Sequence, residues 1–243
     1  MMYPVTCCAV FLSRPNRFIA LVSLAGETVD CHVKNTGRCK ELLVPGATVI
    51  LAKAAGNQSR RTQYDLIAVY KGKQLINMDS QAPNQVMKEW LSQQGLFGEP
   101  IQLLRPEFRY LESRLDFYLE TAGRRCMMEV KGVTLETEGM VRFPDAPTER
   151  GIRHLNTLIT AAEHGYFALV CFVIQMEAVK GFAPNWETHA AFGEKLREAA
   201  AKGVEIIAMD CVVTENSLTV RREVPIYLEP DLRSDASPRP SIL

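Results

Sequence analysis

The chain has 243 residues, enough for one large or two small domains that each bury a core. Its apolar fraction of 47% and charged fraction of 23% are ordinary for a globular protein, and no apolar run approaches the roughly 20 residues that span a bilayer. The N-terminal stretch has no basic region ahead of its short apolar segment, so we expect no signal peptide, no membrane partner and a cytoplasmic protein.

The distribution of charge and the spacing of the cysteines indicate whether nucleic acid or zinc is an expected partner. The formal net charge is zero, yet residues 1–80 hold ten Lys and Arg against five Asp and Glu, which leaves the rest of the chain with an acidic surplus. A basic front half favours a nucleic-acid partner, with a solvated basic surface as the alternative. The seven cysteines show no CxxC pair, so buried free thiols are expected rather than a zinc site.

The first 80 residues alternate short β-branched runs with turn residues, at a spacing typical of a small barrel. The predicted strands are Phe18–Leu24, Thr28–Val33, Ala47–Ala52, Asp65–Tyr70 and Gln74–Met78. An OB-like barrel of this kind binds single strands with a basic groove and stacking surfaces.

Two polar loops of this region carry the residues predicted to contact nucleic acid. They are Lys34, Asn35, Thr36, Gly37 and Arg38 in the first loop, and Arg60 and Arg61 in the second. Asn and Gly are also ordinary turn residues, so a purely structural turn is the alternative for the first loop.

From Pro83, the predicted domain boundary, the pattern changes to helices and strands. In chain order we expect a helix at Asn84–Gln94, strands at Glu107–Tyr110, Arg114–Glu120 and Cys126–Val130, a helix at Glu149–His164, a strand at Tyr166–Ile174, a helix at Glu194–Lys202 and a strand at Glu205–Met209. The almost uninterrupted apolar run of residues 166–174 indicates a strand that is buried on both faces. The chain is therefore predicted to be α+β, with a barrel domain at 1–82, an α/β domain with a mixed central sheet at 83–228, and a disordered tail at 229–243.

Two carboxylates and an ammonium are predicted to share one face of that sheet. Glu129 and Lys131 flank Val130, and residues i and i+2 of a strand project to the same side. If the two neighbouring runs pair as a hairpin across the polar turn at 121–125, Asp116 comes alongside Glu129. Such a cluster suits a divalent cation beside a phosphodiester, and three solvated charges on an exposed face are the alternative.

The spacing of Asp116, Glu129 and Lys131 resembles the PD-(D/E)XK nuclease superfamily, although Leu115 stands where that motif has proline. The stretch VKGVTLETEGMVRFPDAPTERGIRHLNTL and the region Asn35–Leu51 are similar to the sugar fermentation stimulation protein family (SfsA), and the resemblance runs from about Phe18 to Asp210. It implies an N-terminal OB-fold-like domain, a nuclease-like domain and DNA binding.

The candidate metal ligands are Asp116 and Glu129, aided by the carbonyl oxygen of Val130, and the expected ion is Mg²⁺ or Mn²⁺ because these oxygen donors suit hard cations. Lys131 is expected to orient a water molecule or to stabilise charge on the phosphate. Glu107 is a further catalytic candidate, through a looser match to the family's strand-borne glutamate.

Two further candidate residues lie on the helix beside the FPDAPTERG loop. Arg150 and His154 lie at i and i+4 on one helix face and could grip phosphate, with a capping or salt-bridge role as the alternative. Asp145 is expected to begin that helix by accepting exposed N–H bonds.

The function predicted from these residues is a DNA-binding protein with a metal-dependent nuclease centre, acting on DNA or RNA with little sequence specificity. The alternative is a non-catalytic DNA-binding regulator of sugar metabolism genes that retains a nuclease fold. No phosphate-cradling glycine loop or carbohydrate motif supports a sugar-processing enzyme. Whether the protein forms a homodimer is left open.

The basic second loop generates the first testable prediction. Replacing Arg60 and Arg61 with alanine should flatten the slope of log affinity against log salt by about one to two units, because each phosphate contact adds roughly −0.9 for duplex DNA and −0.7 for single strands. Titrations at several salt concentrations measure the slope. An unchanged affinity and slope in the double variant would remove this loop from the binding surface.

Overall fold

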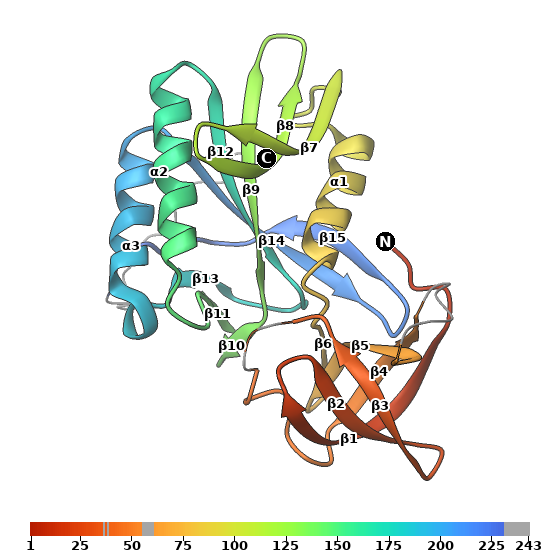
Figure 1. The fold of residues 1–243 in the computed structure, drawn as a ribbon. Helices are drawn as coiled ribbons and strands as arrows, with labels where there is room; N and C mark the ends of the chain where they lie inside the picture. Colours follow the sequence, from red (N-terminus) through yellow and green to blue (C-terminus); the bar gives the residue numbers. More distant parts are fainter. Residues whose placement is uncertain (36, 38, 55–60, 231–243) are drawn as a thin grey trace.

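The computed structural model describes residues 1–35, 37, 39–54 and 61–230, which form a barrel and a mixed sheet flanked by helices (Figure 1). The predicted α+β class, with an OB-like barrel ahead of a mixed central sheet, is confirmed. The predicted contact residues Thr36, Arg38 and Arg60, and nearly all of the predicted tail, lie outside the described residues. Within the described ranges, no helix combines the length and apolar character that crossing a membrane would take.

The first unit is a closed barrel of five strands with one short extension. Its strands are β1 (Thr6–Asn16), β2 (Ile19–Leu24), β3 (Glu27–Val33), β4 (Thr48–Lys53), β5 (Tyr64–Lys71) and β6 (Gln74–Asn77). They run in the order β3-β2-β1-β4-β5-β6, and a parallel pairing of β3 with β5 closes the barrel. Strand β1 was not predicted, because apolar side chains occupy both of its faces: Ala9 and Phe11 are buried, while Val10 and Leu12 are exposed.

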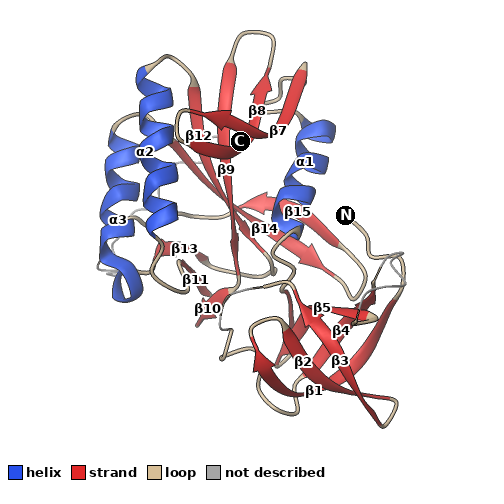
Figure 2. Ribbon diagram, viewed as in Figure 1, coloured by secondary structure: helices blue, strands red, loops and turns tan. Residues whose placement is uncertain are grey.

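The second unit is built on a six-stranded sheet of order β15-β14-β12-β9-β8-β7 (Figure 2). Its elements are α1 (Ala82–Gln94), β7 (Leu103–Tyr110), β8 (Ser113–Glu120), β9 (Arg125–Val133), β10 (Leu135–Thr137), β11 (Met140–Phe143), α2 (Glu149–Glu163), β12 (Phe167–Ile174), β13 (Gly181–Pro184), α3 (Trp186–Ala201), β14 (Glu205–Val213) and β15 (Leu218–Glu223). Strands β9, β12 and β14 are parallel, β8 pairs antiparallel with β9 and β15 pairs antiparallel with β14, and the edge strand β7 pairs antiparallel with β8.

Helices cover both faces of this sheet, which explains the apolar run of β12. Helix α1 packs against β9 and β15, whereas α2 and α3 lie on the other side (Figure 1). Val170 and Phe172 join the apolar cluster under α2 and α3, while Cys171 and Val173 join the cluster under α1. Strand β12 is therefore buried on both faces, as its composition predicts.

The starts of two helices differ from the prediction. Helix α2 is capped by Thr148, whose side chain accepts a hydrogen bond from Gly151 N at 3.0 Å, so the prediction that Asp145 begins this helix was wrong. Helix α3 starts at Trp186 rather than Glu194, because a non-helical conformation at His189 interrupts its periodicity. The three-stranded sheet β10-β11-β13 was also missed, since its strands have only three or four residues.

The first residues of the chain contact the second unit. Tyr3 N donates to Asn216 O at 2.8 Å, and Met2 forms an isolated bridge with Ser217 in the β14–β15 hairpin. Residues ahead of β1 therefore reach past the barrel and join the last hairpin of the sheet.

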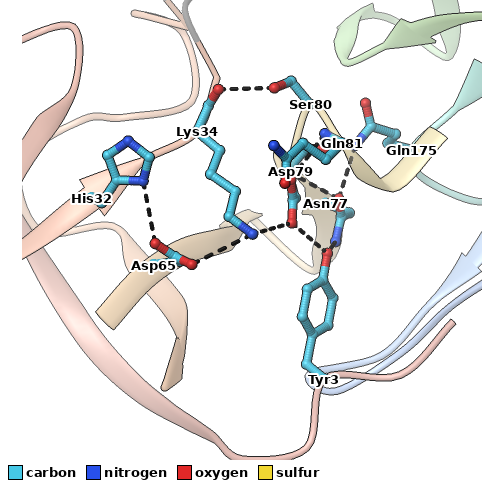
Figure 3. A network of polar contacts seen from close by, with 9 residues as sticks. All are labelled: Tyr3, His32, Lys34, Asp65, Asn77, Asp79, Ser80, Gln81 and Gln175. Atoms are coloured by element: carbon cyan, nitrogen blue, oxygen red, sulfur yellow. Dashed lines mark hydrogen bonds and ion pairs between the residues drawn. The ribbon is translucent and has the colours of Figure 1, made fainter. Parts of the chain in front are cut away.

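A buried polar network joins the two units (Figure 3). The Lys34 ammonium lies between two carboxylates, 3.4 Å from Asp65 Oδ2 and 3.1 Å from Asp79 Oδ2. Asp79 also accepts from the Tyr3 hydroxyl at 3.3 Å, and Gln175 of the second unit donates to Asp79 O at 3.0 Å. A phosphate would have to compete with both carboxylates for Lys34, which was predicted to contact nucleic acid.

This network predicts that removing the Lys34 side chain lowers the free energy of unfolding more than removing an exposed lysine does. Lys34→Ala should lower the free energy of unfolding by about 1–3 kcal/mol, because it leaves two carboxylates facing each other without their cation. Lys53→Ala, at an exposed barrel position, is the matched control and should stay within about 0.5 kcal/mol of wild type. Urea unfolding measures both variants. Equally small losses of unfolding free energy in both variants would show that the network does not stabilise the fold. Lys34 would then remain a candidate for contact with nucleic acid.

Candidate functional site

Asp116 is positioned by one backbone and one side-chain donor. Strands β8 and β9 pair as the expected hairpin, and Phe117 opposite Met128 is the last pair in register before Asp116 and Glu129. Asp116 Oδ2 accepts from Val130 N at 2.8 Å, and its Oδ1 accepts from Asn84 Nδ2 at 2.7 Å. Burial and the nearby charge of Glu129 raise the pKa of Asp116, although these two hydrogen bonds oppose the shift.

Glu129 is the buried carboxylate of the site, with only 2% of its surface exposed. Its Oε1 contacts both Lys131 Nζ and His154 Nδ1. Burial alone would raise the pKa of Glu129, but the hydrogen bond from His154 and the charge of Lys131 outweigh it and lower the pKa below its ordinary value. Glu129 is therefore held as a carboxylate inside the sheet.

His154 lies in a chain of contacts that runs from α2 into the sheet. Its Nε2 is 3.4 Å from Arg150 Nε, and its Nδ1 lies against Glu129 and 3.4 Å from Lys131 Nζ. Because Arg150 can only donate, Nε2 is the acceptor and Nδ1 carries the proton toward Glu129. At 5% exposure, His154 is a buried partner of Glu129 rather than a surface residue.

The second oxygen of Glu129 is the feature that fits a metal. Oε2 is buried and has no hydrogen-bond partner among the described residues. A buried carboxylate oxygen without a donor is costly unless a cation or ordered water compensates it. Asp116 on the paired strand offers a second carboxylate, and carboxylate oxygens suit a hard divalent cation.

The described chain offers few ligands beyond these two. It contains no group of three or more His, Cys, Asp or Glu side chains arranged for a metal ion. Mg²⁺ often takes one or two carboxylates and completes its shell with water and phosphate oxygens, so two carboxylates are sufficient for that ion.

The remaining predicted site residues lie in different settings. Glu107, on the edge strand β7, has a side chain that is 68% exposed and lies 3.6 Å from Arg114, so it is an exposed partner of an arginine rather than a buried carboxylate. Arg61 is 86% exposed and lies 3.9 Å from Asp30. Arg150 is exposed at the start of α2.

The first loop of the barrel is a structured turn. Asn35 Oδ1 accepts from Gly37 N at 2.8 Å, and Arg14 donates to the carbonyls of Asn35 and Gly37 at 2.7 and 2.8 Å. Gly37 also approaches the second unit closely, because an added Cβ would lie 2.4 Å from Asp145 Oδ2. The turn interpretation thus describes the geometry of this loop, and contact with nucleic acid stays a prediction.

Sequence reasoning missed Asn84, and it missed that His154 faces the metal candidates. Asn84 lies in the first turn of α1, directly after the domain boundary. This position gave no sign that its side chain donates a hydrogen bond to Asp116 on β8. His154 was paired with Arg150 by helical spacing, but the register that sets it against Glu129 depends on how α2 packs over β9.

A closed OB-type barrel followed by a helix-flanked mixed sheet, with an Asp on β8 and a Glu-x-Lys segment on β9, defines a two-domain α+β protein. Residues 12–78 match the SfsA N-terminal OB domain, and residues 81–217 match the sugar fermentation stimulation protein RE domain. The chain belongs to the sugar fermentation stimulation protein family.

Relatives and a solved structure agree with this assignment. The chain is 52% identical over 218 residues to a sugar fermentation stimulation protein homolog of Clostridium beijerinckii, covering 90% of this chain and 96% of that protein. Identity to the Desulfitobacterium hafniense homolog is 56%, with 90% and 94% covered. The structure of Pyrococcus furiosus SfsA in complex with Ca²⁺ has a TM-score of 0.82 at 28% identity and covers 93% of this chain and 97% of that one.

The buried contacts of His154 generate a stability prediction. His154→Ala should lower the free energy of unfolding by about 2–4 kcal/mol, since it removes the hydrogen bond to a buried carboxylate and opens a cavity. His164→Ala, which removes an exposed histidine bonded to the Tyr110 hydroxyl, is the matched control and should cost less than about 1 kcal/mol. Denaturant unfolding at neutral pH measures both; similar losses would mean that His154 does not support Glu129.

Proposed function

We propose that this protein is a metal-dependent phosphodiesterase that cleaves DNA or RNA. The observation that carries the proposal is a buried, ionised Glu129 whose Oε2 has no partner among the described residues, beside Asp116 and next to the Lys131 ammonium. A purely structural site would gain more from apolar residues there, because buried charges contribute to stability only when they are fully compensated.

The ion would be held by Asp116 and Glu129, with the Val130 carbonyl as a further donor and water completing the shell. Mg²⁺ or Mn²⁺ fits these oxygen donors, and the Ca²⁺ complex of the Pyrococcus furiosus relative supports a site for a divalent cation. When bound, such an ion polarises the scissile phosphate and lowers the pKa of a coordinated water.

The protein's own residues prepare this site for an anionic substrate. Asn84 and Val130 N fix both oxygens of Asp116, while His154 and Lys131 share Oε1 of Glu129 and leave Oε2 available. Lys131 contacts Glu129 and keeps 15% of its side chain exposed, so it is the cation that we assign to the substrate phosphate. Its charge would offset the negative charge that develops on the phosphate oxygens during attack.

Nucleic acid would be gathered chiefly by the barrel, which carries the basic surplus of residues 1–80. OB-type barrels bind single strands through basic grooves and aromatic surfaces, with little sequence preference. Arg61, which is 86% exposed, is free enough to take part.

Two variants separate metal binding from catalysis. Asp116→Asn should weaken Mn²⁺ binding by more than about tenfold, because it removes a charged ligand. Lys131→Ala should keep or tighten Mn²⁺ binding, since an ammonium has no lone pair for a metal, yet it should abolish cleavage. Calorimetry with Mn²⁺ and incubation with plasmid, single-stranded DNA and RNA measure the two effects.

Lys88→Ala, at an exposed position of α1, is the control and should cleave like wild type. If wild type binds no divalent cation and cuts no nucleic acid, the phosphodiesterase proposal fails, and the DNA-binding regulator with a nuclease fold takes its place.

A further inference from the structure

A small crevice opens where the barrel meets the sheet, next to the candidate site. Its volume is about 120 Å³, and its lining includes Asn35 from the barrel and Gly132, Arg142, Phe143 and Asp145 from the second unit. Gly132 directly follows Lys131 on β9, so the crevice begins one residue along the strand from the candidate catalytic lysine, whose side chain is not part of the lining. Sites that enclose a drug-sized ligand usually measure roughly 300–1,000 Å³, so this space suits one planar group rather than a larger molecule.

Two charged side chains of the crevice are not used by the fold. Arg142 is half-buried, yet neither its guanidinium nor the Asp145 carboxylate forms an ion pair or hydrogen bond with a described residue. Asn35, which also lines the crevice, uses its Oδ1 to accept from Gly37 N, so its amide N–H groups are not part of that turn contact. The lining thus includes donor groups of Asn35 and Arg142, together with the acceptor oxygens of Asp145.

The shape of the crevice depends on two close backbone approaches. A Cβ on Gly132 would lie 2.7 Å from Gln175 Oε1 and 2.8 Å from Pro83 Cγ, and a Cβ on Gly37 would lie 2.4 Å from Asp145 Oδ2. The barrel turn is therefore packed against the loop between β11 and α2, with Arg14 holding its carbonyls. The network around Lys34, one residue before Asn35, fixes the same junction (Figure 3).

An exposed aromatic side chain lies at the same end of the barrel. Phe18 is 46% exposed, and the Arg17 guanidinium lies 5.0 Å from the centre of its ring. The carbonyl oxygen of Phe18 accepts a hydrogen bond from Val33 N at 2.7 Å. Arg14 also donates to Arg17 O at 2.7 Å, so it connects this turn to the Asn35–Gly37 turn. An exposed ring beside a guanidinium is a stacking surface for an unpaired base.

We propose that the crevice receives one unpaired base of a single-stranded nucleic acid whose backbone passes Lys131, so that the substrate class is single strands rather than duplexes. A base edge carries both donors and acceptors and can pair with Arg142, Asn35 and Asp145 together, whereas the Asp145 carboxylate would repel a phosphate. A base inside a duplex cannot enter so narrow a space unless it leaves the stack. This inference rests on the proposed function, because the strand is the substrate of the same site.

The test measures binding with a chelator present, so that cleavage plays no part. Wild type should bind a labelled single strand at least about tenfold more tightly than the duplex of the same sequence at the same salt. Arg142→Ala should weaken single-strand binding by about tenfold, which corresponds to one good contact to a base edge. Arg109→Ala, which removes an exposed arginine from the edge strand β7, is the matched control and should change affinity far less.

Asp145→Ala distinguishes a base from a phosphate in the crevice. It should weaken single-strand binding if the carboxylate accepts from a base, and it should strengthen binding if the crevice holds a phosphate. Asp145 lies in an exposed loop, so its alanine variant distinguishes a base from a phosphate even if Arg142→Ala fails to fold.

Equal affinity for single strands and duplexes, equal effects of Arg142→Ala and Arg109→Ala, or tighter binding by Asp145→Ala would each overturn the inference. Cleavage assays with Mn²⁺ keep the two proposals apart. Cleavage without a preference for single strands would overturn this inference alone, while single-strand binding without any cleavage would overturn only the phosphodiesterase.

Discussion

The compensation of one buried carboxylate is the constraint on which the second unit depends. Glu129 is on a strand of the central sheet and is almost inaccessible to water, so it can remain charged only because Lys131 and His154 share one of its oxygens. This arrangement fixes where α2 must lie, since His154 reaches the carboxylate only in one register over β9. It also leaves the second oxygen of Glu129 without a partner among the described residues, and a cation held there and by Asp116 on the paired strand would reduce the cost of burying two acids.

The junction between barrel and sheet follows the same physical rule with different residues. Lys34 lies between Asp65 and Asp79, and Asp79 is tied in turn to Tyr3 and Gln175. Buried charges of this kind cost less when every hydrogen-bonding group has a partner, so the two units are held in one relative orientation. The candidate site and the crevice beside it both depend on that orientation, because each uses residues close to the junction.

Much of the fold was predictable because strong local patterns coincide with burial. The apolar run of β12, the helical spacing of α2 and the turn between β8 and β9 are local signals, and their elements formed where expected. Strand β1, the small sheet of β10, β11 and β13, and the start of α3 were missed, because their sequences are either apolar on both sides, too short or interrupted by a kink. The pairing of Asp116 with Glu129 could be inferred from strand periodicity, whereas the contacts of Asn84, His154 and Lys34 are set by packing between distant segments. No periodicity within one element carries that information.

The contact between residues 2–3 and the β14–β15 hairpin has a consequence for the order of folding during synthesis. Met2 and Tyr3 leave the ribosome before the barrel strands do, but their partners Ser217 and Asn216 are made more than two hundred residues later. At about 5–20 residues per second, these segments wait on the order of 10–40 seconds for each other. The barrel strands can pair during that interval, whereas the segment ahead of β1 must stay unpaired. Closure of this segment is therefore a late event, and it can occur only after the hairpin that completes the edge of the sheet has been made.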